Sequence, residues 1–503
     1  MTTCPFRNQR ENDVVKPDWP DVPQPLQSYF ESGEKATKCT QLLRKYRRSR
    51  SGVSRGPWSH LPCRRVTEAF EPPAQVARKV EIDGLDDLGL SGATVLLRVD
   101  INAPIDPRTG TFLDERRIQE IMPTLDRLAG NPVVMLAHQS RPGRDDYTSL
   151  APHARALSHM MKRDVQLSQD LHHAPETLER IKNLQPSDIL LLDNVRFLAE
   201  EIALSRASPE QMVKSHFVRE LSSVSDVFVN DAFACSHRSS PSTVGFTHTL
   251  PAAGGQLMMK EVTALNNAIR GKVSPSAAVL GGIKLDDTVR IARRLLEEER
   301  IDEVWMIGGA AAMFLRIAGH EPGQASFSAL KRELGDIFDS TMKEAEELWQ
   351  AHESRIRLPI DVALATKDGR MDVSINELPS DDPIEDIGLQ SAQALSVAIR
   401  NAKLVIANGP AGVFEKPAFS FGTIEMLNAC AEMNGDAVLG GGHTVTLCTQ
   451  RGLIHRMAHV STGGGACLDL LSGRPMPVLE ALAAARERRL SGEEPTVGFE
   501  PTA

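Results

Sequence analysis

The sequence is poor in cysteine, and the few cysteines follow no pattern that would bind a metal or build a disulfide framework. Seven cysteines are scattered over 503 residues, an odd number without a single CxxC pair. This spacing argues against a disulfide-stabilised scaffold and against a cysteine zinc site. Reduced, buried thiols are therefore expected.

Long hydrophobic runs are also missing. No stretch approaches the 18 or so apolar residues that cross a bilayer, and the opening MTTCPFRNQRENDVVKPDW has no apolar core of a secretory signal. We therefore expect no membrane partner and a cytoplasmic location. With 41% hydrophobic residues the chain can still bury a sizeable core, and its length predicts two or three domains.

Outside the N-terminal segment, negative charges outnumber positive ones. The net charge is −9, although residues 1–80 hold 15 Lys/Arg against 8 Asp/Glu. The remainder is acidic, so no nucleic-acid partner is expected. Three interpretations of the basic run at 44–55, RKYRRSRSGVSR, stay open: a tail that touches an anionic partner, a disordered extension, or an artefact of start-codon assignment.

From about residue 93 the chain alternates short apolar runs with amphipathic stretches. Such runs, separated by helices, are typical of parallel sheets covered on both faces. The predicted strands are 94–100, 132–139, 188–195 and 226–231, then 276–282, 303–309, 355–361, 403–409, 436–442 and 457–465. We predict two doubly wound, Rossmann-like α/β domains joined by a helix at 255–270, and a last helix at 477–490.

The turns after these strands differ between the two halves. Before residue 240 they carry arginine and histidine, as in RVDINAP, AHQSRPG, NVRF and AFACSHR. After residue 280 they are rich in glycine, as in LGGIK, IGGA, ANGPAGVFE and LGGGHT. Cationic side chains suit a compact phosphorylated substrate, whereas glycine turns let backbone N–H groups approach nucleotide phosphates. Two phosphate-bearing ligands, one per half, are predicted.

Taken together and in this order, these segments resemble phosphoglycerate kinase over about residues 97–482. RVDINAP resembles the family's RVDxNxP, and LLLDNVRF, NDAFACSHRSSPSTVGF, LGGIKLDD and HVSTGGGACLDLLSG also match family segments. AHQSRPG, GGGHT and ANGPAGVFE look most like its archaeal-type branch. The resemblance implies reversible phosphoryl transfer between 1,3-bisphosphoglycerate with ADP and 3-phosphoglycerate with ATP, with Mg²⁺, in line and on domain closure.

The resemblance also implies site residues. Arg117 and Lys284 are the implied catalytic pair, with Lys284 on the moving phosphoryl group. The implied contacts to the triose substrate are Asp100, Ile101, Asn102, Arg117, His138, Gln139, Ser140, Arg141, Arg196 and Arg238. The nucleotide contacts are Gly282, Lys284, Asn408, Gly409, Pro410, Glu415 (on the ribose), Gly441, Gly442, His443 and Thr444.

Two positions depart from the common family pattern. His443 stands where many members carry an aspartate implicated in metal-nucleotide binding, and Thr288 stands where many carry a second lysine. Both fit the archaeal-type branch. They leave open which carboxylate contacts the metal, with Asp287 as the candidate, and whether Lys284 acts alone.

The expected domains are a basic extension (1–84), a 3-phosphoglycerate domain (85–260), a nucleotide domain (261–475), and a C-terminal helix and tail (476–503). The chain could be a monomer or a homodimer. A dehydrogenase and a P-loop kinase are disfavoured because no GxGxxG or GxxxxGK[ST] motif is present. The remaining alternative is a non-catalytic phosphoglycerate kinase-like protein that binds nucleotide or a partner.

Overall fold

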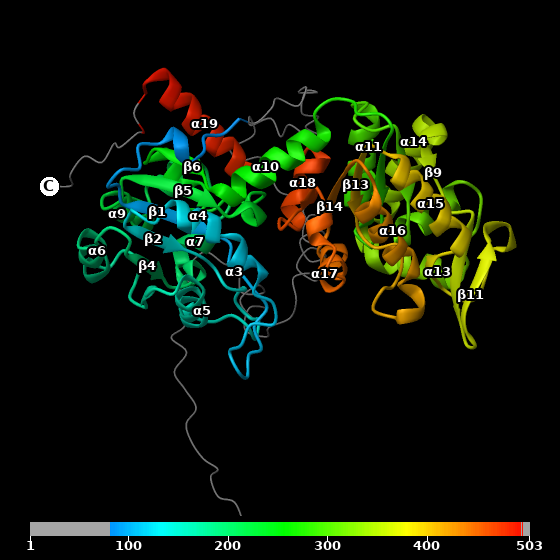
Figure 1. Cartoon of the computed structure of the whole chain (residues 1–503), viewed down its shortest axis with the longest axis horizontal. Coiled ribbons are helices and arrows are strands. Elements are labelled where there is room, and N and C mark those ends of the chain that lie inside the picture. Colours follow the sequence, from blue (N-terminus) through cyan, green and yellow to red (C-terminus); the bar gives the residue numbers. More distant parts are fainter. Residues whose placement is uncertain (1–80, 494, 496–503) are drawn as a thin grey trace, which may run out of the picture. The chain divides into compact units, whose positions relative to one another are not determined.

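The computed structural model describes residues 81–493 and residue 495, which form three β-sheets surrounded by helices (Figure 1). Residues 1–80 of the predicted extension, and most of the predicted tail, lie outside this range. Two sheets have six parallel strands each, which confirms the predicted fold class. Within the described range, no helix combines the length and the apolar character needed to cross a membrane.

The first sheet has the strand order β3-β4-β2-β1-β5-β6. Its strands are β1 (Val95–Val99), β2 (Val133–Leu136), β3 (Gln166–Ser168), β4 (Ile189–Leu192), β5 (Val227–Asp231) and β6 (Ala252–Gly254). The four predicted strands are present as β1, β2, β4 and β5. The two edge strands, β3 and β6, were not predicted, because three residues are too few to form a recognisable apolar run.

Burial on both faces explains the continuous apolar runs. Every residue of β1, VLLRV, is buried. Leu96 belongs to the core cluster on one face of the sheet and Leu97 to the cluster on the other, because successive side chains of a strand point in opposite directions. Helices complete both layers: α3 (Arg116–Glu120), α4 (Met122–Arg127), α5 (Ala151–Met161), α6 (Pro175–Lys182), α7 (Ala199–Ala203), α8 (Pro209–Val213) and α9 (His216–Ser222).

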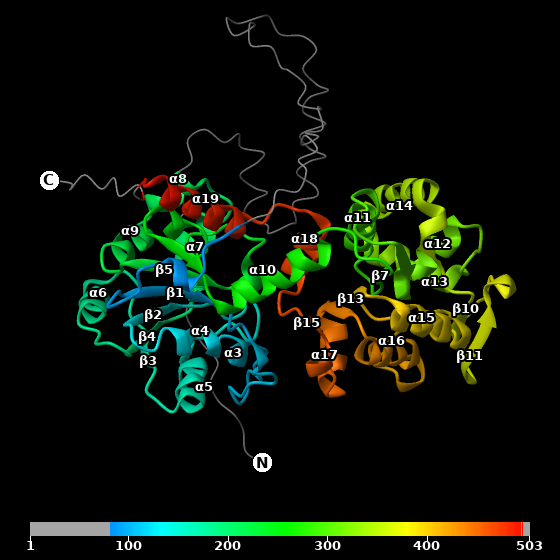
Figure 2. The same ribbon diagram turned by 45° about the horizontal axis from the view of Figure 1, so that its top comes forward.

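Two helices connect the halves of the chain. The predicted connector is confirmed as α10 (Gln256–Ile269), and Figure 2 shows it running between β5 and α18. The predicted last helix is confirmed as α19 (Pro477–Ser491), which returns to pack on β6 (Figure 1). Arg489 of α19 donates to the buried Asp83 at 2.6 and 2.9 Å. The last helix thus covers the first sheet.

The second sheet has the order β15-β14-β13-β7-β8-β9. Its strands are β7 (Ser276–Leu280), β8 (Glu303–Met306), β9 (Ile356–Arg357), β13 (Leu404–Asn408), β14 (Asp436–Gly440) and β15 (His459–Val460). Its helices are α11 (Leu285–Glu297), α12 (Gly308–Ile317), α13 (Gln324–Leu334), α14 (Phe338–His352), α15 (Leu389–Asn401), α16 (Phe421–Glu432), α17 (Gly442–Gln450) and α18 (Gly465–Ser472).

One predicted strand is wrong. The run RIRLPID at 355–361 does not form a single strand, because Pro359 lacks the N–H that a sheet ladder needs. Its first part forms β9, and Asp361 instead begins a strand of an antiparallel sheet that was not predicted. That sheet has the order β11-β10-β12 and contains β10 (Asp361–Thr366), β11 (Gly369–Ser374) and β12 (Ile384–Ile387).

Candidate active site

Functional side chains follow the carboxyl ends of neighbouring strands in each sheet. β1 ends at Val99, β2 at Leu136 and β4 at Leu192, and the predicted arginine and histidine motifs begin in or just after these strands. Because β1, β2 and β4 are parallel neighbours, their carboxyl ends lie along the same edge of the sheet. The fold therefore gathers residues about 100 positions apart in the sequence.

A buried carboxylate and a partly exposed guanidinium form the first pair. Arg117 Nη1, from α3, donates to Asp100 Oδ2 at 2.5 Å. Burial on its own raises the pKa of Asp100, but Arg117 and the backbone N–H of Asn102 outweigh it and hold that pKa below its usual value. In return, Asp100 raises the pKa of Arg117. Because 35% of the Arg117 side chain is exposed, its remaining N–H groups can contact a ligand.

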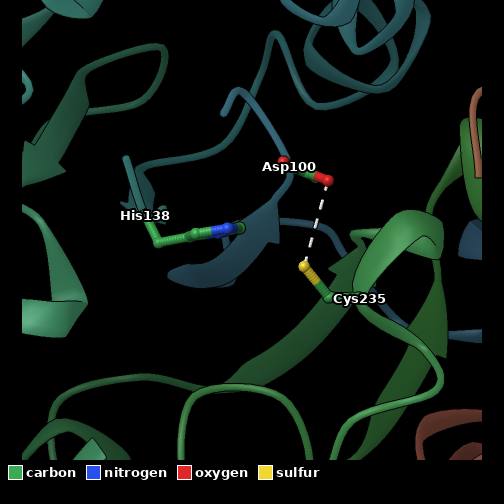
Figure 3. Close-up of side chains that lie close together, drawn as sticks. All are labelled: Asp100, His138 and Cys235. Carbon is green, nitrogen blue, oxygen red and sulfur yellow. Dashed lines mark hydrogen bonds between the residues drawn. The ribbon is translucent and has the colours of Figure 1, made fainter. Parts of the chain in front are cut away.

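His138 lies beside this pair and is almost fully buried. Its Nδ1 is 3.2 Å from Nη2 of the buried Arg98. Burial lowers the pKa of His138 well below 6.5, and Arg98 acts in the same direction while Asp100 opposes it. Figure 3 shows the imidazole reaching toward Asp100 and Cys235. The Cys235 Sγ is 3.9 Å from Asp100 Oδ2, and burial raises the pKa of this thiol to about 11.

Three further arginines of the prediction differ in their surroundings. Arg196 donates to the backbone carbonyl of Ser140, and burial lowers its pKa. Arg238 is exposed, and its Nε approaches His237 Nε2 at 2.9 Å. Arg196 and Arg238 also contribute to the lowered pKa of His138, which they face. Arg141 is exposed on the loop after β2. With Arg117, these cations form what we call the basic basin.

The other predicted triose contacts hold the loops of the basin. Asn102 Oδ1 accepts from the Ser140 backbone N–H at 2.8 Å. Gln139 is fully buried and exchanges two hydrogen bonds with the backbone of Ala103, at 3.2 and 2.9 Å. Ile101 is completely buried. The side chains of Gln139 and Ile101 are therefore engaged in supporting the loops.

In the second half, a cavity of about 380 Å³ opens among the predicted nucleotide residues. Gly282, Pro410, Glu415 and His443 line it, together with residues of α12, α13 and β12. Apolar side chains such as that of Leu330 make up much of the remaining wall. A cavity of this size, largely apolar and with a few polar groups, suits a nucleoside.

Two glycine turns interlock beside this cavity, whose lining includes Gly282 and Pro410. The Gly281 N–H donates to the Asn408 carbonyl at 2.8 Å, and the Gly282 N–H donates to the Pro410 carbonyl at 2.9 Å. Gly409 has φ of +85°, and a Cβ there would lie 2.2 Å from the Gly281 carbonyl oxygen. Only glycine fits, because such a contact is impossible and the backbone is left-handed.

The LGGGHT turn ends at the predicted helix start, now α17. Gly441 precedes this nine-residue helix with φ of +81°. The first N–H groups of a helix have no intrahelical partner, so they are available to an anion. The Thr444 hydroxyl can add a donor, since its Oγ1 is buried and has no hydrogen-bond partner among the described residues; the acceptor Asn408 Oδ1 is also buried and without a partner there. His443, the second residue of α17, packs its ring 5.7 Å from that of Phe414.

Lys284 precedes α11 and is exposed. Asp287 lies one turn later and forms an ion pair with Arg474 Nη1 at 2.8 Å, and the same nitrogen donates to Asp469 at 2.8 Å. Burial, followed by the charge of Asp286, raises the pKa of Asp287. A metal ion on Asp287 would therefore compete with Arg474. Thr288, in place of the second lysine, is buried and donates to the Lys284 carbonyl at 3.1 Å.

Several buried charged groups were not predicted from the sequence, among them one arginine and one glutamate. One is Arg98, although an arginine inside the apolar run VLLRV was a usable signal. The other is Glu261 of α10, which lies fully buried and accepts from His459 at 2.8 Å and from the Thr462 hydroxyl at 2.7 Å. Its place on the apolar face of α10, beside Val262 and Leu265, was the corresponding signal.

Comparisons with known proteins agree on one family. The family model described as phosphoglycerate kinase matches residues 85–474. A phosphoglycerate kinase of Methanothermus fervidus is 39% identical over 406 residues, which are 80% of this chain and 97% of the relative. A phosphoglycerate kinase of Archaeoglobus fulgidus is 40% identical over 404 residues, again 80% of this chain and 97% of the relative.

Solved structures give the same result. The crystal structure of phosphoglycerate kinase from Pyrococcus horikoshii superposes with a TM-score of 0.74 at 35% identity, covering 81% of this chain and all of the other. The phosphoglycerate kinase structure from Coxiella burnetii has a TM-score of 0.67 at 28% identity, covering 80% of this chain and 99% of the other.

Proposed function

The chain belongs to the phosphoglycerate kinase family, and from this premise we propose how its residues divide the work of a phosphoglycerate kinase. The reaction is the reversible transfer of a phosphoryl group between 1,3-bisphosphoglycerate with ADP and 3-phosphoglycerate with ATP. One observation supports this division of roles: the basic basin lies at the strand ends of the first sheet, whereas the glycine-lined cavity lies at the strand ends of the second sheet.

In this proposal, residues 85–260 bind the triose and residues 261–475 bind the nucleotide. Arg117, Arg196 and Arg238 face the phosphate and carboxylate of 3-phosphoglycerate, because planar guanidinium groups suit bidentate anion binding. The base and ribose occupy the 380 Å³ cavity, with Glu415 on a ribose hydroxyl. The phosphates lie against the first turn of α17. Residues 1–84 are an extension, and residues 476–503 are the helix that covers the first sheet, with its tail.

The chemistry requires no covalent enzyme intermediate. Phosphoryl transfer depends mostly on positioning and on neutralising the charge of a loose transition state. Lys284 and Arg117 supply positive charge from opposite halves, and the amides of α17 add the positive end of a helix dipole. The acyl phosphate is a good leaving group, so no general base is needed toward ATP. Closure about the connector α10 brings the ligands in line and excludes water.

We propose that Mg²⁺ binds together with the nucleotide. Magnesium in kinases is commonly bound by one or two carboxylates together with the substrate phosphates. Asp287 is the carboxylate that we assign to it, since burial raises its pKa and its one paired cation within the described residues is Arg474, whereas the neighbouring Asp286 pairs with both Arg290 and Arg474 at 3.6 Å. When bound, the ion would neutralise phosphate charge. Arg474 would then keep its second carboxylate, Asp469.

A non-catalytic role is not favoured, because the curated relatives are phosphoglycerate kinases. A cytoplasmic location is part of the proposal and rests on composition, and cell fractionation would test it. The choice between monomer and homodimer is open to light scattering on the purified chain.

The test is a coupled assay with the full chain, 3-phosphoglycerate and ATP, with and without Mg²⁺. We expect turnover that requires all three. Lys284→Met should lower kcat at least a hundredfold, because one charge on the transferring group contributes about 3 to 4 kcal/mol. Its ADP affinity, measured by calorimetry, should stay within a few-fold of wild type. Lys272→Met, at an exposed lysine that pairs with Asp302, is the matched control. No turnover by the wild type, or full activity of Lys284→Met, would refute the proposal.

A further inference from the structure

The cluster in Figure 3 has the composition of a metal site but not its chemistry. Ligand atoms of Asp100, His138 and Cys235 lie within 4.8 Å of one another, and all three residues are buried. The two stronger ligands, however, already accept hydrogen bonds from cations: Asp100 from Arg117, and His138 Nδ1 from Arg98. A metal ion would have to displace two guanidinium groups. The cluster is better suited to contact an anion.

The contact with Arg98 determines which imidazole nitrogen carries the proton. Arginine has only donors, so His138 Nδ1 must present its lone pair. The proton of the neutral ring then lies on Nε2. We propose that Arg98 is a positioning residue that holds His138 as a neutral Nε2–H donor, so that the triose substrate meets a hydrogen bond rather than an imidazolium charge. This inference rests on the proposed function of the basin.

Arg98 is itself fixed by a buried chain of hydrogen bonds. Its Nε donates to Ser242 Oγ at 3.1 Å, and its Nη1 to the Val99 carbonyl. Ser242 in turn donates to Glu201 of α7 from its hydroxyl at 2.7 Å and from its backbone N–H at 2.9 Å. Arg98 is 2% exposed. Because its Nε, Nη1 and Nη2 are all engaged by Ser242, Val99 and His138, it acts on a ligand through His138.

The charges around His138 favour the same state. Asp100 faces the ring and favours its protonation, whereas burial, Arg98, Arg196 and Arg238 oppose it. The Cys235 thiol is neutral, because burial raises its pKa to about 11. The ring therefore stays uncharged across the range in which an ordinary histidine titrates. Removing Arg98 removes both the hydrogen bond that selects the tautomer and one of the charges that oppose protonation.

The experiment measures KM for 3-phosphoglycerate from pH 5.5 to 8 in wild type, Arg98→Gln, His138→Gln and the double variant. The ratio of variant to wild-type KM cancels the ionisation of the substrate phosphate near pH 6. We expect this ratio to fall about threefold or more as the pH drops to 5.5 in Arg98→Gln, because losing the Arg98 charge raises the pKa of His138 from its lowered value, although burial still opposes protonation, and a protonated ring attracts the anion. The double variant should lack this trend. The exposed His159→Gln is the control.

Direct observation of the ring keeps the inference testable if Arg98→Gln does not fold. Nitrogen-15 spectra of histidine-labelled wild type, recorded without substrate, should assign the proton to His138 Nε2 from pH 5.5 to 8. A proton on Nδ1, or titration near pH 6.5, would overturn the inference. So would an Arg98→Gln variant whose KM rises equally at every pH, because Arg98 would then contact substrate directly. Since these spectra need no turnover, they separate this inference from the failure of the proposed function.

Discussion

Gly409 offers the sharpest test of the nucleotide site, because the effect of a single methyl group can be worked out in advance. In Gly409→Ala the new Cβ would lie 2.2 Å from the Gly281 carbonyl oxygen and 2.8 Å from the Gly282 nitrogen. Real contacts of this kind exceed 3.0 Å, so one turn must move by about 1 Å. A displacement of that size in a binding site can reduce function about a hundredfold.

The backbone itself adds a second cost, and the chain supplies a control that isolates it. A left-handed alanine costs about 1 to 2 kcal/mol relative to glycine. Gly319 has φ of +94° with no atom within 4 Å of an added Cβ. Gly319→Ala therefore carries the same backbone cost without the clash.

Calorimetric titration with ADP and urea unfolding should distinguish the two variants. We expect the Kd for ADP to rise at least tenfold in Gly409→Ala and to stay within about twofold of wild type in Gly319→Ala. Overpacking should destabilise Gly409→Ala by about 1 to 3 kcal/mol more than the control. Equal Kd values and equal unfolding midpoints in the two variants would refute the interlocked-turn argument.

Three further predictions concern Arg117, the buried histidines His153 and His172, and the N-terminal residues 1–80. Arg117→Ala should lose about 3 to 5 kcal/mol of transition-state stabilisation, measured as kcat/KM for 3-phosphoglycerate. Its neighbour Arg116, which pairs with Glu120 of the same helix, should tolerate alanine and is the control. Near-normal activity of Arg117→Ala would contradict its role. His153 and His172 are buried with pKa values lowered by burial to about 4. Because the folded state disfavours their protonation, the free energy of unfolding is highest above the unfolded pKa near 6.5 and falls as the pH drops toward 4, by about 2 kcal/mol per histidine at pH 5. In urea unfolding, the His153→Gln and His172→Gln variants should lose less stability in acid than wild type. An unchanged acid loss would contradict this reasoning. Deletion of residues 1–80 should leave kcat, KM and the thermal midpoint nearly unchanged at low and high salt, and a drop of the midpoint by more than about 4 °C would assign the extension to the working structure.

The sequence predicted those parts of the fold that depend on local pattern. Apolar runs located the main strands, and Gly409 and Gly441 marked turns whose backbone only glycine adopts readily. Three-residue strands such as Ala252–Gly254 carry no comparable pattern. The antiparallel sheet was missed because the run at 355–361 reads as one strand until Pro359 is considered.

The sequence predicted which residues belong to the site but not which of them contact one another. Motifs named Asp100, Arg117 and His138 individually, whereas their pairing depends on strand order. The chain from Arg98 through Ser242 to Glu201 joins residues more than 100 positions apart, and no local pattern encodes such a contact. The same is true of the bond between Asp287 and Arg474.

The return of α19 to the first sheet has a consequence for biosynthesis. α19 (Pro477–Ser491), which is made after the other helices of the described residues, packs on β6, and its Arg489 pairs with Asp83 near the start of the described range. During translation the first sheet must therefore emerge with this flank uncovered and wait for the second half to be made. The half that leaves the ribosome first is the last to be completed. The chain truncated after residue 476 should consequently have a second half that is protected from protease while its first half remains cleavable.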